Sequence, residues 1–342
     1  MKNILITGGA GFVGANAAFY FLKKGWRVII ADNFSRKGAR INADWLRKEF
    51  PDESLLKIIE ADIPCDAFEL FKLVTKADVV LHTAAQVAVT TSVTKPFSDF
   101  EINCRGTLNV LEAVRSAGHK PIVIYTSTNK VYGNLKNVEF SEEISRYVFQ
   151  NRPYGISEEE PLDFYSPYGC SKGAADQYVH DYCRIYGIPT IVFRQSCIYG
   201  PHQFGIVDQG WLAYLTACAL FDKPITIYGN GKQVRDVLFV SDLVKGFDLA
   251  VENIKATKGE IYNIGGGPKN TVSILELIKF LEDFLKKKIT PKFDESRPGD
   301  QLVYISDIRK AEKEFGWRPE TGFKEGMEKM ITWLKKNKKN LF

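Results

Sequence analysis

The chain has 342 residues, of which 45% are hydrophobic and 25% are charged. This length predicts about two domains, and the composition excludes a disordered or fibrous chain. The net charge of +5 is too small for the electrostatic field of a nucleic-acid-binding protein, so we expect no nucleic acid partner.

No stretch of the chain has the pattern of an export or membrane segment. The sequence opens with MKNILITGG, where a glycine turn follows too few apolar residues for a signal peptide, and nowhere do about 18 apolar residues run together. We therefore expect a cytoplasmic protein with no membrane partner. The six cysteines form no CxxC pair and have no histidine at ligand spacing, so we expect reduced thiols and no metal site.

Short β-branched runs alternate with longer amphipathic segments in the first half of the chain. Strands are predicted at Asn3–Ile6, Arg27–Ala31, Leu56–Glu60, Val79–His82, Ile122–Thr126 and Thr190–Phe193. Helices are predicted near Phe12–Lys24, Ala39–Glu49, Ala67–Thr75, Asp99–Ala117 and Pro167–Tyr186. Because the strands are apolar throughout, they fit a parallel sheet that is covered by helices on both faces. The sequence predicts an α/β fold with a doubly wound parallel sheet, the Rossmann arrangement.

The alternation ends after Arg194, where Gly, Pro and aromatic residues crowd together in SCIYGPHQFGIVDQGW. We expect the chain to leave the sheet there and to return once, through a helix that begins near Ser241 and the strand Ile261–Ile264. A smaller, mostly helical C-terminal lobe is expected from the helical patterns near Val272–Lys286, Asp307–Phe315 and Phe323–Lys336. A substrate would lie in the cleft between the two lobes.

The first predicted strand runs directly into TGGAGFVG and then into a helix. Gly8, Gly11 and Gly14 have the spacing GxxGxxG, which allows a tight turn, close approach of the backbone to a pyrophosphate, and close packing of the helix on the strand. Asp32 directly follows the second predicted strand, at a position where a carboxylate accepts hydrogen bonds from both ribose hydroxyls. Together these residues predict a dinucleotide site, and the alternative for the glycines is a structural turn without a nucleotide.

The charge of Asp32 also favours one dinucleotide over the other. A 2′-phosphate beside this carboxylate would meet a like charge, so NAD is favoured over NADP as the cofactor. The nearby cations Arg36 and Lys37 would instead favour the 2′-phosphate of NADP.

The string YGCSK places Tyr168 and Lys172 four residues apart at the start of a predicted helix, and therefore on one face. A free phenol has a pKa of about 10, so a pKa of about 7 requires ~4 kcal/mol of differential stabilisation. A lysine cation ~4 Å away supplies energy of that order at an effective dielectric constant of about 20. The pair is therefore a candidate general base for a sugar hydroxyl. Thr128, at the end of the fifth predicted strand, is placed to hydrogen-bond the same hydroxyl.

These motifs occur in a characteristic order. With TGGAGFVG, Asp32, Asp62, HTAAQ, STNKVYG, YxxxK and RPGD, the chain resembles an extended short-chain dehydrogenase/reductase of the nucleotide-sugar epimerase type over nearly its whole length. Within that group, the strings STNKVYG, PLDFYSPYGCSKGAADQY, FRQSCIYGPHQFG and DQGW are most similar to the CDP-tyvelose (CDP-paratose) 2-epimerases.

The resemblance implies a role for individual residues. The catalytic triad of the family is matched by Thr128, Tyr168 and Lys172. The implied cofactor contacts are Gly8, Gly11, Phe12, Val13, Gly14, Asp32, Asn33, Ser35, Asp62, Ile63, Thr83, Ala84, Ala85, Asn103, Thr126, Tyr168, Lys172 and Ser196. The implied substrate contacts are Thr128, Gln86, Cys197, Arg235 and Arg297. The two arginines would hold the substrate diphosphate, because a guanidinium group offers paired donors to phosphate oxygens.

Two positions depart from the pattern of the family. Many members carry Asn where Cys197 stands, and the galactose-type epimerases often carry Lys near the position of Val87. Both departures predict a different pose of the sugar. Neither affects the predicted redox machinery.

The implied activity is NAD-dependent epimerisation of a CDP-hexose at carbon 2 through a transient 2-keto sugar, because an unactivated carbon 2 carries no acidic proton. The sugar pair would be paratose and tyvelose or glucose and mannose. The nearest alternative is a nucleotide-sugar 4-epimerase or 4,6-dehydratase on the same fold. The dehydratases of the family carry Asp and Glu directly after the catalytic Thr, whereas this chain has Asn129 and Lys130. An NAD-binding protein without catalysis is the alternative of another class.

The domain organisation follows from the same resemblance. We expect residues 1–195 together with 236–265 to form the NAD-binding domain, and residues 196–235 together with 266–342 to form the substrate-binding lobe. The expected partner is a nucleoside diphosphate sugar, with CDP as the nucleotide. The expected assembly is a homodimer or homotetramer.

Overall fold

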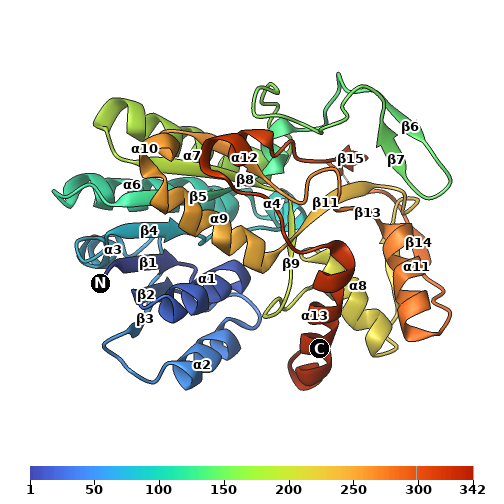
Figure 1. The fold of residues 1–342 in the computed structure, drawn as a ribbon, viewed down its shortest axis with the longest axis horizontal. Helices are drawn as coiled ribbons and strands as arrows, with labels where there is room; N and C mark the ends of the chain where they lie inside the picture. Colours follow the sequence, from blue (N-terminus) through green and yellow to red (C-terminus); the bar gives the residue numbers. More distant parts are fainter. Residues whose placement is uncertain (298, 342) are drawn as a thin grey trace.

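The computed structural model describes residues 1–297 and 299–341, and its centre is a seven-stranded sheet (Figure 1). The strands lie in the order β12-β8-β5-β4-β1-β2-β3, and every neighbouring pair is parallel. Their bounds are β1 (Asn3–Thr7), β2 (Arg27–Asp32), β3 (Leu56–Glu60), β4 (Val79–His82), β5 (Ile122–Thr128), β8 (Thr190–Gln195) and β12 (Ile261–Ile264). The order reverses at β1, where a ligand site is expected in such a sheet. The predicted doubly wound sheet is confirmed.

Helices cover both faces of the sheet. On one face pack α1 (Phe12–Lys23), α2 (Ala39–Glu49), α9 (Val240–Glu252) and α12 (Arg309–Phe315). On the other face pack α3 (Ala67–Val74), α6 (Gly106–Ser116) and α7 (Ser166–Tyr186). Because successive strand residues point to opposite faces, Ile4 and Ile6 join the first core and Leu5 joins the second.

The segments after β8 build a second core beside the sheet (Figure 1). Its helices are α8 (Trp211–Leu220), α11 (Ile274–Leu285) and α13 (Phe323–Lys336), with the short 3-10 helix η3 (Lys338–Asn340). Its strands are β9 (Cys197–Tyr199), β10 (Thr226–Tyr228), β11 (Val234–Phe239), β13 (Thr271–Ser273), β14 (Lys292–Asp294) and β15 (Val303–Tyr304). Helices α11 and α13 were predicted from the sequence, whereas α8, η3 and these short strands were not. The division into residues 1–195 with 236–265 and residues 196–235 with 266–342 stays a prediction, and Pro298 and Phe342 lie outside the described residues.

One predicted helix is divided in the structure. Where the sequence predicted a helix near Asp99–Ala117, the structure has α5 (Pro96–Phe100), the π-helix η1 (Glu101–Arg105) and α6. Helix α4 (Val89–Thr94) precedes them, and Pro96 at the start of α5 separates the two. The remaining elements are η2 (Asn129–Tyr132), the hairpin strands β6 (Phe140–Glu142) and β7 (Tyr147–Phe149), and α10 (Ile254–Thr257).

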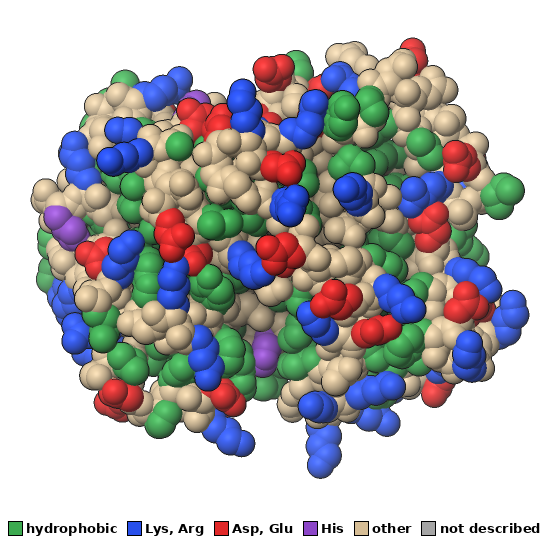
Figure 2. All heavy atoms as spheres, viewed as in Figure 1, with side chains coloured by type: hydrophobic (Ala, Val, Ile, Leu, Met, Phe, Trp, Pro, Cys, Tyr) green, Lys and Arg blue, Asp and Glu red, His purple; other side chains and the backbone are tan. Residues whose placement is uncertain are grey.

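The surface carries charges of both signs. On the face shown in Figure 2, Lys and Arg side chains are intermingled with Asp and Glu side chains over the elements of the sheet domain. Among the described residues, no helix is long and apolar enough to cross a membrane.

A buried ion pair fixes helix α7 to the sheet. The guanidinium of Arg194 on β8 donates to both carboxylate oxygens of Asp176 on α7, at 3.0 and 2.9 Å. The two side chains are 3% and 0% exposed. Ser127 Oγ donates a further hydrogen bond of 2.6 Å to Asp176, and Arg194 donates one of 3.1 Å to the Tyr132 hydroxyl. Strands β5 and β8 therefore supply the partners that tie this carboxylate to the sheet, and Gln177 on α7 itself donates one more hydrogen bond of 2.9 Å.

We predict that Arg194→Met lowers the free energy of unfolding by about 3–5 kcal/mol, because it leaves Asp176 buried without its partner. The matched control is Arg184→Met. Arg184 pairs with Asp181 on the exposed face of α7, where the two side chains are 60% and 45% exposed, so its loss should cost less than about 1 kcal/mol. Urea denaturation of both variants measures the difference. Equal losses would contradict the assignment of the buried pair.

His82 joins three elements beneath the carboxyl ends of the strands. Its ring nitrogens lie 2.6 Å from Thr7 Oγ1 on β1 and 3.0 Å from Thr107 Oγ1 on α6. Burial, helped by the charge of Lys172, lowers the pKa of His82 to about 3. The folded chain therefore keeps this ring neutral, whereas the unfolded chain binds a proton as the pH falls through about 6.5.

We predict that His82 makes the protein lose stability as the pH falls below about 6.5. Since the unfolded state alone gains the proton, the free energy of unfolding should fall by up to about 1.4 kcal/mol per pH unit, which amounts to roughly 2 kcal/mol at about pH 5. His82→Gln should lack this component. Urea denaturation of both proteins at neutral and mildly acidic pH tests the prediction, and identical pH slopes would refute it.

Candidate functional site

The turn between β1 and α1 brings bare backbone to the start of a helix. Gly8 has a φ of +67°, and a Cβ at this residue would lie 2.6 Å from the backbone nitrogen of Ala84, while a Cβ on Gly14 would overlap the Gly8 carbonyl. Helix α1 begins at Phe12, and its N-cap residue, Gly11, gives no side-chain cap. Unpaired amide groups at a helix N-terminus attract an anion, so this turn fits a pyrophosphate group of the kind NAD carries.

The residues predicted to contact adenosine lie together at the ends of β2 and β3. Asp32 is buried and accepts hydrogen bonds from two backbone amides at 2.8 and 2.9 Å. Burial raises the pKa of Asp32, and these amide contacts oppose the increase. Asn33 donates a hydrogen bond of 2.8 Å to Asp62 and accepts one of 2.7 Å from the Ser35 hydroxyl. Ile63 is buried beside Gly106 on α6.

A cavity of about 420 Å³ opens at the carboxyl ends of the central strands and extends to the second core. The predicted site residues that line it are Phe12, Val13, Thr83, Ala85, Thr126, Thr128, Tyr168, Lys172, Ser196, Cys197, Arg235 and Arg297. Residues predicted to contact the cofactor and residues predicted to contact the substrate therefore line one cavity, although they are far apart in the sequence.

Two predicted contacts support the wall of the cavity instead of lining it. Asn103 and Gln86 exchange hydrogen bonds of 2.8 and 3.0 Å, and the Gln86 amide donates a third, of 2.7 Å, to Asp99. Both side chains are buried, and neither is among the described residues that line the cavity. They fix η1 and α5 against the end of β4, and ligand contact by either residue stays a prediction.

The predicted triad is assembled by α7 and β5. Tyr168 and Lys172 are buried on one face of α7, and the Thr128 side chain hydrogen-bonds Tyr168. The Lys172 ammonium donates a hydrogen bond of 2.6 Å to the Thr126 carbonyl and lies 4.1 Å from the centre of the Tyr125 ring. Lys172 is therefore held beneath the cavity by strand β5.

Burial dominates the electrostatics of this pair. It raises the pKa of Tyr168 to about 12, while the Thr128 hydrogen bond and the charge of Arg36 lower it and the charge of Asp99 raises it further. Burial also lowers the pKa of Lys172 to about 7, against the nearby carboxylates. The sequence analysis considered only the attraction between phenolate and ammonium. Desolvation, which the sequence does not show, favours the neutral form of both groups.

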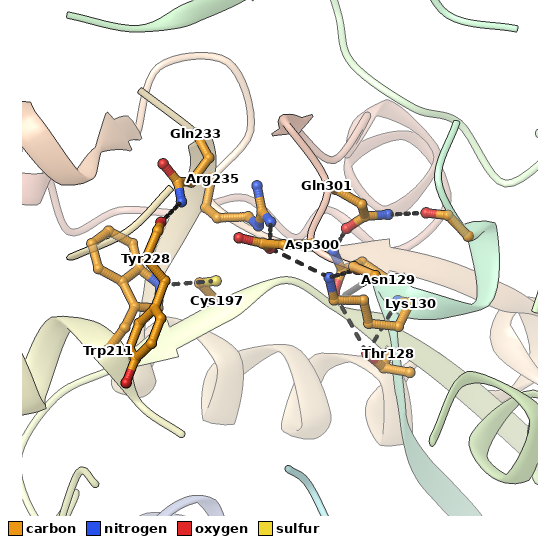
Figure 3. Close-up of polar contacts among 12 residues, drawn as sticks. Thr128, Asn129, Lys130, Cys197, Trp211, Tyr228, Gln233, Arg235, Asp300 and Gln301 are labelled. Atoms are coloured by element: carbon orange, nitrogen blue, oxygen red, sulfur yellow. Dashed lines mark hydrogen bonds and ion pairs between the residues drawn. The ribbon is translucent and has the colours of Figure 1, made fainter. Parts of the chain in front are cut away.

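The predicted phosphate ligands both line the cavity, and Arg235 shares the carboxylate of Asp300 with Lys130 (Figure 3). Arg235 on β11 donates a hydrogen bond of 2.5 Å to Asp300, and the Cys197 thiol on β9 accepts one of 3.4 Å from the Trp211 indole. Arg297 lies 3.2 Å from Asp208 and has its guanidinium 4.0 Å from the centre of the Tyr228 ring.

Several residues of the cavity were missed by the sequence analysis. These are Trp211, Tyr228, Gln233 and Asp300, which line it together with Lys130. Asp300 closes the string RPGD, in which only Arg297 received a role, so a sequence signal existed for it. Trp211 closes the string DQGW, so a sequence signal existed for it too, whereas Tyr228 carries no motif because its place in the cavity depends on how β10 packs.

Comparisons with known proteins agree with this geometry. Residues 5–330 match the family described as GDP-mannose 4,6 dehydratase. The chain is 44% identical to a CDP-paratose 2-epimerase of Salmonella typhi over 96% of this chain and 98% of that protein, and 30% identical to a UDP-glucuronate 4-epimerase of Thermodesulfobacterium geofontis over 98% and 97%.

Solved structures give the same result. A UDP-glucuronic acid 4-epimerase of Bacillus cereus, in complex with UDP-glucuronic acid and NAD, superposes with a TM-score of 0.84 at 30% identity and covers 98% of this chain and 99% of its own. A dTDP-glucose 4,6-dehydratase of Streptomyces venezuelae with NAD bound has a TM-score of 0.83 at 28% identity, with coverage of 99% and 98%. The chain therefore belongs to the GDP-mannose 4,6-dehydratase-like family of extended short-chain dehydrogenase/reductases.

Proposed function

We propose that this protein is an NAD-dependent epimerase that inverts carbon 2 of a CDP-hexose. The glycine turn, the uncapped start of α1 and the carboxylate of Asp32 suit NAD. The relative that is 44% identical over nearly its whole length is a CDP-paratose 2-epimerase. Both findings support the same class of reaction, a reversible oxidation of a nucleotide sugar.

The observation that carries the proposal is the absence of an elimination acid and base beside Thr128. Asn129 donates a hydrogen bond of 3.1 Å to Gln301, and Lys130 donates one of 3.1 Å to the Gly299 carbonyl (Figure 3). Among the described residues, the carboxylates that line the cavity are Asp208 and Asp300, and each is paired with an arginine. A 4,6-dehydratase needs free groups of this kind to remove water, so epimerisation is favoured over dehydration.

Each residue of the triad has a task in the proposed reaction. Thr128 orders the carbon 2 hydroxyl, and the Tyr168 phenolate takes its proton, which Lys172 favours by its positive charge when it is protonated. NAD, when bound, supplies reversible hydride acceptance at the same carbon. The product of oxidation is a planar 2-keto sugar, which must present its other face before reduction. Arg235 and Arg297 would retain the diphosphate during that rotation.

The remaining expectations concern substrate and assembly. CDP is proposed as the nucleotide on the strength of the similarity to the Salmonella typhi protein. The sugar pair is proposed to be paratose and tyvelose, with glucose and mannose as the second pair. The homodimer or homotetramer and the cytoplasmic location stay predictions.

We predict that CDP-paratose carrying deuterium at carbon 2 gives CDP-tyvelose with the deuterium still at carbon 2, because the hydride returns to the carbon that it left. NMR of the ring positions measures both the inverted centre and the label. Tyr168→Phe is the control variant, and it should bind NAD and give no product.

Other outcomes separate the alternatives. Loss of the label to solvent would refute hydride return. Inversion at carbon 4 would make the protein a 4-epimerase, and a 4-keto-6-deoxy product would make it a dehydratase. Bound NAD without turnover of any nucleotide sugar would favour a protein without catalysis.

A further inference from the structure

The cavity contains more positive charge near the triad than the predicted phosphate ligands supply. Among the described residues, four cations line it: Lys130, Lys172, Arg235 and Arg297. Lys172 is bonded to the Thr126 carbonyl beneath the triad, and Arg297 lies at the other end against Tyr228. The other two cations, Lys130 and Arg235, both lie against the carboxylate of Asp300 (Figure 3).

Lys130 is held next to the triad by its position in the chain. It follows Thr128 by two residues in η2, and its backbone nitrogen donates a hydrogen bond of 3.2 Å to Thr128 Oγ1. Its Nζ donates a hydrogen bond of 3.1 Å to the Gly299 carbonyl and lies 3.8 Å from Asp300. The side chain is only 19% exposed. The ammonium group thus lies in the wall between Thr128 and Arg235.

The chemistry of the substrate explains why a cation at this place matters. In a nucleoside diphosphate sugar the β-phosphate is attached through oxygen to carbon 1, and carbon 2 is the next atom of the ring. Carbon 4 lies across the ring from carbon 1. An enzyme that oxidises carbon 2 must therefore bind the β-phosphate much closer to its general base than an enzyme that oxidises carbon 4.

We propose that Lys130, together with Arg235, binds the β-phosphate beside Thr128 and Tyr168 and thereby selects carbon 2 as the reacting centre. This inference rests on the proposed function and names the residue that determines its position specificity. Two cations against the single carboxylate of Asp300 leave one positive charge for the phosphate. The cavity wall near Lys130 and Arg235 also includes the Cys197 thiol, which is a weak hydrogen-bond donor. Lys130 is therefore the strong phosphate donor that lies nearest to Thr128.

The electrostatics of Lys130 are consistent with this role. Burial, followed by the charge of Arg235, lowers its pKa to about 8, and Asp300 acts in the opposite sense. A phosphate group at this position would raise the pKa again, because an adjacent anion favours the protonated amine. Lys130 would then be charged when the substrate is bound.

The test compares CDP with CMP as ligands of the NAD-loaded protein. The two nucleotides differ by the β-phosphate, and neither carries the hexose, so their ratio of dissociation constants isolates the contact that we propose. Calorimetry would measure the ratio for the wild type, Lys130→Met, Lys130→Arg and the control Lys136→Met. Lys136 has a side chain that is 69% exposed and does not line the cavity.

We expect Lys130→Met to reduce the preference for CDP over CMP by about tenfold or more, because the variant loses one hydrogen bond between charged groups. Affinity for CMP should change little, Lys130→Arg should restore most of the preference, and Lys136→Met should match the wild type. An unchanged preference in Lys130→Met would overturn the proposal. The position of inversion in the wild type is measured separately by NMR, so a failure of the proposed carbon 2 chemistry is distinguishable from a failure of the phosphate contact.

Discussion

The structure depends on the burial of two ionisable groups on one face of α7. Tyr168 and Lys172 are both buried, and burial shifts both groups towards their neutral forms, with pKa values of about 12 and about 7. A neutral phenol is a poor general base, so burial by itself opposes the proposed role of Tyr168. A positive charge beside Tyr168 would reverse this, because an adjacent cation favours the phenolate in a medium of low dielectric constant. Oxidised NAD would supply such a charge through its nicotinamide ring if it bound with that ring near Tyr168, and cofactor binding would then favour the proposed general base.

The surroundings of α7 keep the pair in place. At its middle the helix is fixed by the buried ion pair of Asp176 with Arg194, and at its start the Tyr168 amide donates a hydrogen bond of 3.1 Å to Ser92. Ser171, on the turn between them, hydrogen-bonds the carboxylate of Asp99. Strand β5 supplies Thr128 and the carbonyl that holds Lys172. The triad is therefore positioned by contacts from β5, β8, α4 and α5, which explains why residues outside the cavity are needed to build it.

The sequence predicts the features that depend on a local residue pattern. It does not predict those that depend on packing between distant segments. Strands β1 to β5 follow from their β-branched runs, and the prediction differed mainly at β5, which continues to Thr128. The π-helix η1 was not predicted, because the apolar pattern near Asn103 fits an ordinary helix. Spacing predicted the glycine turn and the pair of Tyr168 and Lys172, and the family resemblance predicted most of the other site residues. The contact of Lys130 with Asp300 joins residues 170 positions apart, and the desolvation of Tyr168 depends on the whole cavity, so neither follows from a local pattern.

A titration of Tyr168 with and without NAD measures this coupling most directly. The near-ultraviolet absorbance of phenolate would be compared between the wild type and Tyr168→Phe, so that the difference reports Tyr168 alone. Without NAD we expect no ionisation of Tyr168 below about pH 10, in line with a pKa of about 12. With oxidised NAD bound we expect ionisation within a unit or so of about pH 7, as a general base requires. A Tyr168 pKa that stays at about 12 in the NAD complex would contradict the proposed role of this residue.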